Sequence, residues 1–528
     1  MLQTCLHQSI ERNALERPDS IAFRCRGDLL TYAQLYTAAC QLANTLLEQG
    51  LSPLDRVGIH MNKSLELPVA IYGILLAGGV YVPIDASAPL NRIEFIIQDC
   101  GIHFLVTNKE KRRTIASLEQ NQKLPLRTVI GIQRDDTIHR TYVDWCSIYD
   151  SVSAPPENKA KEDDLAYIMY TSGSTGLPKG LMHTHRSGLA YARHSADLYQ
   201  VVPEDILGNH APIHFDISTF ELLTGPFVGA TTVLIPEEEL MFPASLARLI
   251  ERERLTFWYS VPLALTQLVL RGEWEGLDLS SLRWVLFGGE PFPPKYLSML
   301  MDRLPGARFC NVYGPAEVNQ CSYYHVPDKE SLSDEPVPIG HIWDAAHHLL
   351  LDDENHLIEK EGTGELLISA STMMQGYWGR SDLNEKAFFH EEPVSGFKRR
   401  YYRTGDLMQR DQNGILHFLG RKDRQIKLRG YRIELDEIEA AFTQQLQVEE
   451  AAAIVVEDPQ GEKTIVAYYK PSIGSSIDSK ELLSTARKNL PSYAVPSRIL
   501  SLDTFPRTGS GKIDRIKLAE LDNERTVS

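Results

Sequence analysis

The chain has 528 residues, of which 43% are hydrophobic and 23% charged, and its formal net charge is −16. A chain this long exceeds a single core and predicts two or more domains. The acidic balance argues against general binding of nucleic acids or anionic membranes, because phosphate-rich partners favour basic surfaces. Seven scattered cysteines without a C-x-x-C pair argue against a disulfide framework or a structural zinc site. The N-terminus lacks the apolar core of a signal peptide, so we expect a cytoplasmic protein.

Strands and helices alternate from the N-terminus to about residue 290, which predicts α/β architecture. Thr31 is a candidate N-cap for a long amphipathic helix that ends at Gly50, and Pro243 begins another helix. Strands are predicted at 21–25, 56–60, 104–107, 128–132, 165–170, 257–260 and 283–287. Short strands and turns from about 337 to 420 predict a β-rich part. The C-terminal hundred residues predict a small α+β domain with helices near 434–446 and 478–490 and strands near 451–457 and 464–470.

The loop from Tyr170 to Gly180 reads Tyr-Thr-Ser-Gly-Ser-Thr-Gly-Leu-Pro-Lys-Gly and joins two predicted strands. Its glycines allow backbone N–H groups to turn toward an oxyanion, and Lys179 adds a compact positive charge. A Walker loop is excluded, because Lys179 follows Pro178 and Lys512 precedes Ile513. A Ser/Thr/Gly loop alone is more often a flexible linker. The flanking strands and the Pro-Lys-Gly ending favour an anion-binding loop.

Ten short segments along the chain carry distinctive residue patterns, at 30–35, 76–85, 170–180, 215–218, 311–317, 364–366, 402–406, 420–439, 490–496 and 506–515. Together they resemble the adenylate-forming (ANL) superfamily, specifically the freestanding adenylation domains of nonribosomal peptide synthetases. The resemblance implies a mixed α/β fold with a large N-terminal domain, residues 1–422, that contains the β-rich part. It also implies a small mobile C-terminal lid domain, residues 423–528, hinged at Asp423. Without the resemblance, Asp423 is one more polar linker residue.

By this resemblance the protein would use ATP and Mg²⁺. Tyr313 would stack on adenine, Glu317 would hold Mg²⁺ and Asp406 would accept both ribose hydroxyls. The β- and γ-phosphates would contact the loop residues Thr171, Ser172, Gly173, Ser174, Thr175, Gly176 and Lys179. Further nucleotide contacts would come from Gly289, Glu290, Asn311, Gly314, Ala316 and Arg421. Read alone, Tyr313 is more often a core aromatic, Glu317 a surface charge and Asp406 a turn residue. Ala316 replaces the threonine that is usual in the family.

Lys512 lies in the glycine-rich segment from Pro506 to Arg515. A lysine in such a loop is usually solvated, but the resemblance implies that this one enters the active site during adenylation. There a cation would stabilise the negative charge that develops on the carboxylate, the α-phosphoryl group and the pyrophosphate. Rotation at Asp423 would then exchange this loop for the face that carries Lys427 and Gly430, and would admit a carrier-protein thiol.

Asp216 lies where amino-acid-activating members of the superfamily pair a carboxylate with the α-ammonium group of the substrate. Its alternative reading is an N-cap for a helix beginning near Ser218. The substrate pocket would be lined by Asp216, Ile217, Phe220, Tyr259, Val285, Phe287, Val312, Gln320 and Cys321. This mostly apolar lining predicts a compact neutral amino acid. Tyr259 and Cys321 are similar to residues of enzymes that load L-proline, whereas Phe287 and Gln320 are bulkier or more polar than expected for proline. Alanine or another small amino acid therefore stays open.

The resemblance implies an AMP-forming ligase that loads the activated amino acid as a thioester onto the phosphopantetheine arm of a separate carrier protein. The sequence ends shortly after Arg515 and leaves no room for a carrier domain, so we expect a freestanding enzyme. An acyl- or aryl-CoA ligase of the same superfamily is the main rival, and Asp216 counts against it. A non-catalytic nucleotide-binding protein is the second rival, and it would need neither Lys512 nor Lys179.

Overall fold

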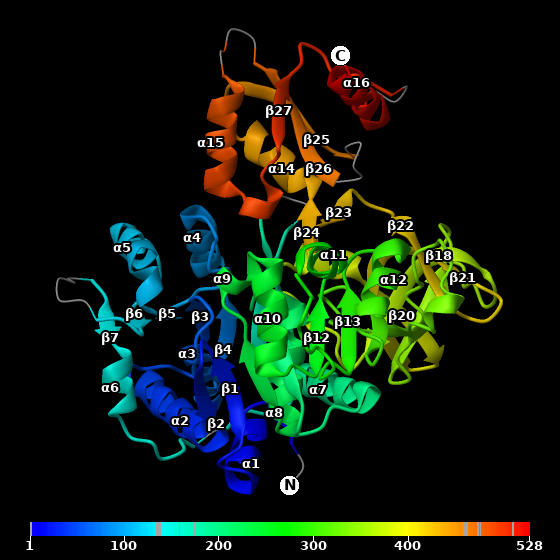
Figure 1. The fold of residues 1–528 in the computed structure, drawn as a ribbon. Coiled ribbons are helices and arrows are strands. Elements are labelled where there is room, and N and C mark those ends of the chain that lie inside the picture. Colours follow the sequence, from blue (N-terminus) through cyan, green and yellow to red (C-terminus); the bar gives the residue numbers. More distant parts are fainter. Residues whose placement is uncertain are drawn as a thin grey trace. The chain divides into compact units, whose positions relative to one another are not determined.

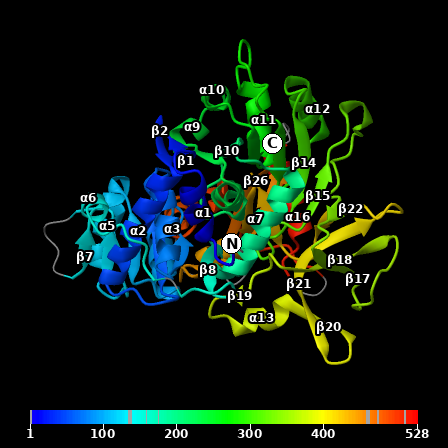
Figure 2. The ribbon, with the colours of Figure 1, turned by 90° about the horizontal axis from the view of Figure 1, so that it is seen from below.

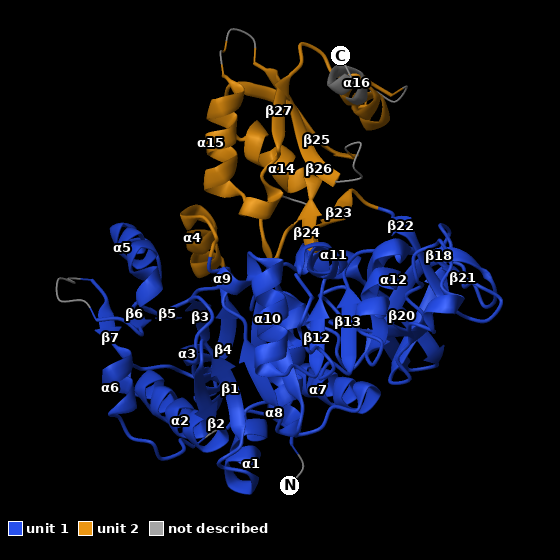
Figure 3. Cartoon of the chain, in the orientation of Figure 1, with its two compact units in different colours: residues 1–86, 100–170, 180–422 blue, residues 87–99, 171–179, 423–528 orange. Residues whose placement is uncertain are grey.

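The computed structural model describes residues 3–133, 139–157, 159–173, 176–457, 463–472, 475, 477–508 and 512–527. The chain divides into two compact units (Figure 3). The first comprises residues 1–86, 100–170 and 180–422, and the second comprises residues 87–99, 171–179 and 423–528. Within the described part of the chain, no helix is both long and apolar enough to cross a membrane.

A nine-stranded sheet lies in the first unit, in the order β16-β15-β14-β13-β12-β10-β11-β1-β2 (Figure 1). The central strands pair in parallel and the strands at both ends pair antiparallel. Parallel pairing brings the carboxyl ends of β12, β13 and β14 to one edge, where ligands commonly bind in such sheets. The bounds are β1 Ile21–Cys25, β2 Asp28–Thr31, β10 Ile206–Asn209, β11 Thr231–Leu234, β12 Phe257–Ser260, β13 Trp284–Gly288, β14 Arg308–Tyr313, β15 Ser322–His325 and β16 His341–Ile342.

A second sheet in the first unit has eight strands, in the order β19-β9-β8-β4-β3-β5-β6-β7. The loop from Tyr170 to Gly180 joins its neighbouring strands β8 and β9, as the sequence predicts. The bounds are β3 Arg56–His60, β4 Val80–Pro83, β5 Phe104–Thr107, β6 Thr128–Ile130, β7 Thr141–Val143, β8 Leu165–Thr171, β9 Lys179–Thr184 and β19 Gly376–Tyr377.

Helices pack on both faces of the nine-stranded sheet. Residues of α10, α11 and α12 share a buried cluster with one face, and residues of α7 share a cluster with the other (Figures 1 and 2). Two helix starts predicted from the sequence are present in the structure. Thr31 Oγ1 accepts a hydrogen bond from the N–H of Gln34 at the start of α2, and Pro243 begins α10. The bounds are α1 Gln8–Glu16, α2 Tyr32–Glu48, α3 Glu66–Leu76, α5 Arg112–Gln120, α6 Trp145–Tyr149, α7 His185–Tyr199, α8 Gly225–Val228, α9 Glu237–Leu240, α10 Pro243–Glu253, α11 Pro262–Arg271, α12 Pro294–Arg303 and α13 Ser381–Ala387.

The short strands predicted between 337 and 420 are present and form most of an antiparallel five-stranded sheet in the first unit. β21 is its centre, pairing with β18, β20 and β22. Its register places Asp406 opposite Arg421, the last residue of β22. The bounds are β17 Ala346–Leu351, β18 Gly362–Ala370, β20 Phe388–Val394, β21 Phe397–Arg410 and β22 Leu416–Arg421.

The second unit has the α+β character that the sequence predicts for the C-terminal part. β26 pairs antiparallel with β25 and parallel with β27, and α14 and α15 pack on this sheet around one core. Helix α4 also belongs to this unit, where the buried Arg92 contacts Glu437 of α14 at 2.8 Å. The bounds are α4 Leu90–Asp99, β23 Gln425–Leu428, β24 Tyr431–Glu434, α14 Leu435–Thr443, β25 Val448–Glu457, β26 Lys463–Pro471, α15 Ser479–Asn489, β27 Arg498–Ser501 and α16 Arg515–Val527.

Candidate functional site

Three residues predicted to bind nucleotide meet in the first unit. Tyr313, at the end of β14, donates from its hydroxyl to Oδ2 of Asp406 at 2.5 Å. Arg421 donates to Oδ1 of the same carboxylate at 2.6 Å, and both side chains of this ion pair are buried. Burial and the adjacent Asp406 carboxylate raise the pKa of Tyr313 well above its ordinary value, so the hydroxyl stays protonated and donates. The carboxylate is thereby held in one orientation, with both oxygens still able to accept further hydrogen bonds.

Glu317 is fully buried in the first unit, a few residues beyond Tyr313. Its Oε1 accepts a hydrogen bond from the hydroxyl of Tyr377 at 2.8 Å. The neighbouring Ala316 is held through its carbonyl oxygen, 3.2 Å from Nε2 of His183. Burial lowers the pKa of His183 to about 4, so the neutral ring donates from Nε2. Tyr377 and His183 are contacts that sequence reasoning missed, because they come from a different sheet and carry no local motif.

The remaining predicted nucleotide residues lie near the same strand ends. Asn311, on β14, donates from Nδ2 to the carbonyl oxygen of Pro338 at 2.9 Å. Gly289 and Glu290 follow β13 directly, and Oε1 of Glu290 accepts from the N–H of Leu263 at the start of α11. At Gly314 a Cβ atom would lie 2.0 Å from the carbonyl oxygen of Asn319, so only glycine fits there. The contacts of Asn311 and Glu290 are structural, and their nucleotide role stays a prediction.

The predicted phosphate loop belongs to the second unit, and its residues Ser174 and Thr175 lie outside the described part of the chain. Ser172 donates from Oγ to the carbonyl oxygen of Arg432 at 2.9 Å. The loop is tightly folded, because a Cβ atom on Gly173 would lie 2.1 Å from the carbonyl oxygen of Leu177. Gly176 donates its N–H to the carbonyl oxygen of Gly173 at 3.0 Å. Oγ1 of Thr171 is buried without a hydrogen-bond partner among the described residues, so this hydroxyl can donate to an oxyanion.

Lys512 and Asp423 also lie in the second unit. Lys512 is exposed, and its carbonyl oxygen accepts from the N–H of Thr508 at 2.9 Å. Asp423 begins the long C-terminal stretch of this unit and accepts the N–H of Gln425 at Oδ1, at 3.2 Å. This short-range contact is a turn typical of aspartate.

Several predicted substrate-binding residues meet on the α7 face of the nine-stranded sheet. Phe220 and Tyr259 are buried and make an edge-to-face contact with ring centroids 5.9 Å apart. Phe220 begins a π-helical turn, Phe220–Thr224, a conformation that occurs frequently at functional sites. Gln320 donates from Nε2 to the hydroxyl of Tyr199 at 2.6 Å. We call this group the aromatic cluster; its members include Tyr191, Tyr199, Ile217, Phe220, Phe257, Tyr259, Leu286 and Val312.

Three of the predicted pocket residues lie elsewhere. Val285 and Phe287 pack with α10, α11 and α12 on the opposite face of the sheet, where Phe287 contacts Phe292. The reason is the strand period of two: Leu286 of β13 faces the aromatic cluster, so both of its neighbours face away. Cys321 is buried in a third cluster with Tyr313, and its Sγ lies 3.7 Å from the carbonyl oxygen of Tyr313. Leu286 pairs with Tyr259 on the neighbouring strand, so the two side chains lie on the same face of the sheet.

Asp216 lies half-buried at the edge of the aromatic cluster, next to Ile217. It is the first residue of a 3₁₀ helix, Asp216–Ser218, rather than its N-cap, and Oδ1 accepts from the N–H of Ile217 at 3.0 Å. The negative charge of Asp216 contributes to the raised pKa of Tyr259, of Tyr191 and of Tyr167, although burial is the largest cause for each. The carboxylate therefore acts electrostatically on Tyr259 and Tyr191 of the aromatic cluster and on the nearby Tyr167.

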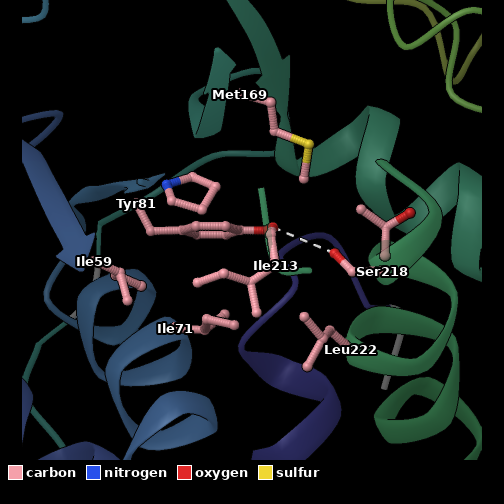
Figure 4. Close-up of a pocket in the computed structure, with 9 residues that line it drawn as sticks. Ile59, Ile71, Tyr81, Met169, Ile213, Ser218 and Leu222 are labelled. Carbon is pink, nitrogen blue, oxygen red and sulfur yellow. Dashed lines mark hydrogen bonds between the residues drawn. The ribbon is translucent and has the colours of Figure 1, made fainter. Parts of the chain in front are cut away.

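A small pocket lies behind this segment, lined by Tyr81 of β4 together with Ser218 and Thr219 (Figure 4). Ser218 donates from Oγ to the carbonyl oxygen of Ile213 at 3.3 Å, and the aliphatic side chains of Ile59, Ile71 and Leu222 surround the Tyr81 ring. The pocket is too narrow to admit a water molecule. It is therefore a packing gap between side chains.

Two groups of potential metal ligands occur in the described residues: Cys5, His7 and His185, and the more exposed Asp352, Glu354 and His356. In the first group Nδ1 of His185 accepts the N–H of Leu6 at 3.2 Å. A neutral imidazole has one lone pair, so this hydrogen bond already occupies the atom that would bind a metal at that position. The first group therefore secures the N-terminal segment to the start of α7.

Comparisons with known proteins identify relatives over most of the chain. A family model described as AMP-binding enzyme matches residues 10–378, and a model described as AMP-binding enzyme C-terminal domain matches residues 437–512. The chain is 32% identical over 517 residues to an L-proline--[L-prolyl-carrier protein] ligase of Pseudomonas fluorescens, covering 97% of this chain and 98% of the relative. It is 34% identical over 499 residues to a ligase of the same name from Streptomyces coelicolor, with 93% and 92% covered.

A further relative is much longer. The chain is 33% identical over 536 residues to a dimodular nonribosomal peptide synthase of Bacillus subtilis, covering 99% of this chain and 22% of that protein. Among solved structures, amide bond synthetase McbA from Marinactinospora thermotolerans has a TM-score of 0.85 at 23% identity, with 98% of this chain and 99% of that chain covered. IdnL1 has a TM-score of 0.79 at 26% identity, with 96% and 100% covered.

These matches cover both the large N-terminal and the small C-terminal domain, and the mixed α/β fold expected from the sequence is confirmed. The chain belongs to the AMP-binding (ANL) enzyme family and is an AMP-forming adenylating ligase.

Proposed function

We propose that the protein activates an amino acid with ATP and then loads it onto a carrier protein. In the first step a carboxylate oxygen of the amino acid bonds to the α-phosphorus of ATP, and pyrophosphate leaves. In the second step the phosphopantetheine thiol attacks the aminoacyl-AMP, a thioester forms and AMP leaves. Membership of the AMP-binding family supports the AMP-forming chemistry, and the two relatives named as prolyl-carrier protein ligases support an amino acid and a carrier protein as substrates.

The nucleotide is proposed to bind through Tyr313 and Asp406. The hydrogen bonds from Tyr313 and Arg421 hold the Asp406 carboxylate in a fixed orientation, which suits a group that must accept two neighbouring ribose hydroxyls. In the second unit, the loop that includes Thr171 and Lys179 is proposed to bind the β- and γ-phosphates, and the buried hydroxyl of Thr171 supports this role. Contacts from Ser172, Gly173, Gly176, Gly289, Glu290, Asn311, Gly314 and Ala316 remain part of the proposal.

Glu317 is proposed to hold Mg²⁺. A carboxylate oxygen is a ligand that Mg²⁺ prefers, and the ion usually completes its coordination with water and substrate phosphates rather than with a cage of protein ligands. Among the described residues, Glu317 belongs to neither group of three or more potential metal ligands, which fits a site with few protein ligands. The ion would neutralise phosphate charge there. The hydroxyl of Tyr377 orients the Glu317 carboxylate.

Asp216 carries the proposal that the substrate is an amino acid. Asp216 is half-buried at the edge of the aromatic cluster, and its negative charge acts on Tyr259 and Tyr191. The α-ammonium group of an amino acid would be attracted to this negative charge, whereas a fatty or aryl acid would bring a second anion and no cation. Asp216 therefore favours an amino acid over the simple acids that related CoA ligases use.

The aromatic cluster favours a compact neutral side chain, and we propose L-proline. Phe220 and Tyr259 are large, uncharged members of this cluster and contact each other edge to face. Phe287, whose bulk counts against proline, packs with α10, α11 and α12 on the opposite face of the sheet, which is compatible with this choice. The similarity to two proline ligases over nearly their whole length supports the same choice.

Amino-acid-dependent ATP–pyrophosphate exchange tests this proposal directly. The full chain is assayed with each of the common amino acids and with benzoate and a short fatty acid. We expect the highest kcat/KM for L-proline and no exchange with the simple acids. Preference for alanine would reject proline but keep amino-acid activation, whereas preference for a simple acid would reject the role of Asp216.

The C-terminal residues are proposed to serve both steps. Lys512 would stabilise the adenylation transition state, and residues 423–528 would rotate as a lid about Asp423 between adenylation and thioester formation. Support comes from the compact unit whose longest stretch begins at Asp423 and from the separate C-terminal family match.

A further inference from the structure

Two ion pairs hold the base of the loop that carries Lys512. Within the second unit, Arg507 bridges to Ile513, so the two arms of the loop run antiparallel. On the first arm, Nη2 of Arg507 lies 2.6 Å from a carboxylate oxygen of Glu450, on β25. On the second arm, Arg515 begins α16, and its Nη2 lies 3.0 Å and 3.1 Å from the two carboxylate oxygens of Glu439, on α14. Each arm therefore pairs with one carboxylate.

Glu439 has two further partners in the same unit. Arg424, directly after Asp423, contacts both carboxylate oxygens in a bidentate pair, at 2.6 Å and 3.0 Å. The backbone N–H of Ala453, on β25, donates to Oε1 at 2.8 Å. One carboxylate thus joins the segment after Asp423, the helix α14, the strand β25 and the start of α16.

We propose that Glu439 is a positioning residue that fixes the Lys512 loop to the segment following Asp423. A rotation at Asp423 then moves Lys512 as part of one rigid body and delivers its ammonium group in a defined place. This inference rests on the proposed function, because it assumes that Lys512 acts in adenylation. A preorganised cation is effective only when it is correctly placed, and a misplacement of about 1 Å can slow a reaction about 10²-fold.

The two ion pairs of the loop differ in burial, which provides a matched control. The side chain of Glu439 is 14% exposed and has three partners. In the Arg507–Glu450 pair the side chains are 42% and 28% exposed. Exposed ion pairs are screened by solvent and contribute little. Neutralising Glu439 should therefore displace the loop, whereas neutralising Glu450 should not.

The test compares Glu439→Gln with Glu450→Gln in the full chain. For Glu439→Gln we expect kcat for pyrophosphate exchange to fall about 10- to 10²-fold. Thioester formation from supplied aminoacyl-AMP should stay at the wild-type rate, because Lys512 takes no part in that step. Glu450→Gln should keep the wild-type rate in both steps. Equal losses in both steps for Glu439→Gln would indicate a general structural defect and would overturn the inference.

A double variant distinguishes positioning from an independent effect. Lys512→Ala should lower exchange about 10²- to 10³-fold. Because Glu439 is inferred to act through Lys512, Glu439→Gln combined with Lys512→Ala should be no slower than Lys512→Ala alone, and additive losses would contradict this. Should Glu439→Gln fail to fold, Arg515→Lys keeps the charge but loses the guanidinium contact, and the same selective loss is expected.

The proposed function and the inference fail in different ways. Wild-type exchange in Lys512→Ala would reject the role of Lys512 in the proposed function. A strong loss in Lys512→Ala together with wild-type kinetics in Glu439→Gln would reject the positioning role of Glu439 alone.

Discussion

Replacing Arg421 with methionine tests how the Asp406 carboxylate is held. The side chains of Arg421 and Asp406 are 9% and 2% exposed and contact each other at 2.6 Å. Removing one partner of a buried ion pair costs about 3–5 kcal/mol, because the other charge stays buried. The first unit has about 400 residues, so its unfolding entropy is about 0.8 kcal/mol per kelvin and its melting temperature should fall about 4–6 °C.

Differential scanning calorimetry measures this shift without reference to any substrate. Arg186→Met is the matched control, because Arg186 also pairs with a carboxylate of the first unit but is exposed, and its removal should shift the transition by about 1 °C or less. The double variant Asp406→Asn/Arg421→Met removes both charges and should recover part of the loss. Strictly additive losses, or a shift in Arg421→Met no larger than in Arg186→Met, would refute the reasoning.

Three other predictions address the substrate, pH and the hinge. Asp216→Asn removes the proposed partner of the ammonium group. We expect kcat/KM for the preferred amino acid in pyrophosphate exchange to fall at least about 10²-fold, because a charge pair is lost. An unchanged kcat/KM would reject an ammonium partner. Burial raises the pKa of Glu221 to about 8, so its contribution to stability is present below its ordinary pKa and is lost as pH rises through 8. The melting temperature of Glu221→Gln minus that of wild type should therefore be larger at pH 9 than at pH 5. The same difference at both pH values would contradict this. Asp423→Pro fixes φ and should slow thioester formation more than adenylation, and equal slowing would argue against a hinge.

The sequence predicted the residues around Asp406 because each lies in a recognisable motif. The motifs predict separate roles for Tyr313, at adenine, and Asp406, at ribose, and in the structure a hydrogen bond joins the two side chains. That contact depends on the pairing of β21 with β22 and on the packing between two sheets, neither of which leaves a local sequence signal. Tyr377 escaped prediction for the same reason, since it reaches Glu317 from a two-residue strand.

The sheet face that each residue of β13 occupies was harder to predict from the sequence. Assigning Val285 and Phe287 to the pocket required knowing which face of β13 they occupy, and a shift of one residue along a strand exchanges the two faces. Both faces of this strand are buried, so hydrophobic alternation gives no indication of the register. Phe220, by contrast, follows Asp216 within one short helical segment, and its place beside Tyr259 depends on fewer long-range contacts.

The composition of the second unit limits how this protein can be divided. Its members include α4 and the loop 171–179, which are separated in sequence from residues 423–528. A variant truncated after Lys422 would lose more than a detachable lid, because Arg92 would be left without Glu437 and Ser172 without the carbonyl oxygen of Arg432. Segments that are distant in the sequence thus form one compact unit. If the C-terminal part is replaced by that of a related protein, α4 and the glycine-rich loop need to be replaced with it so that these contacts are kept.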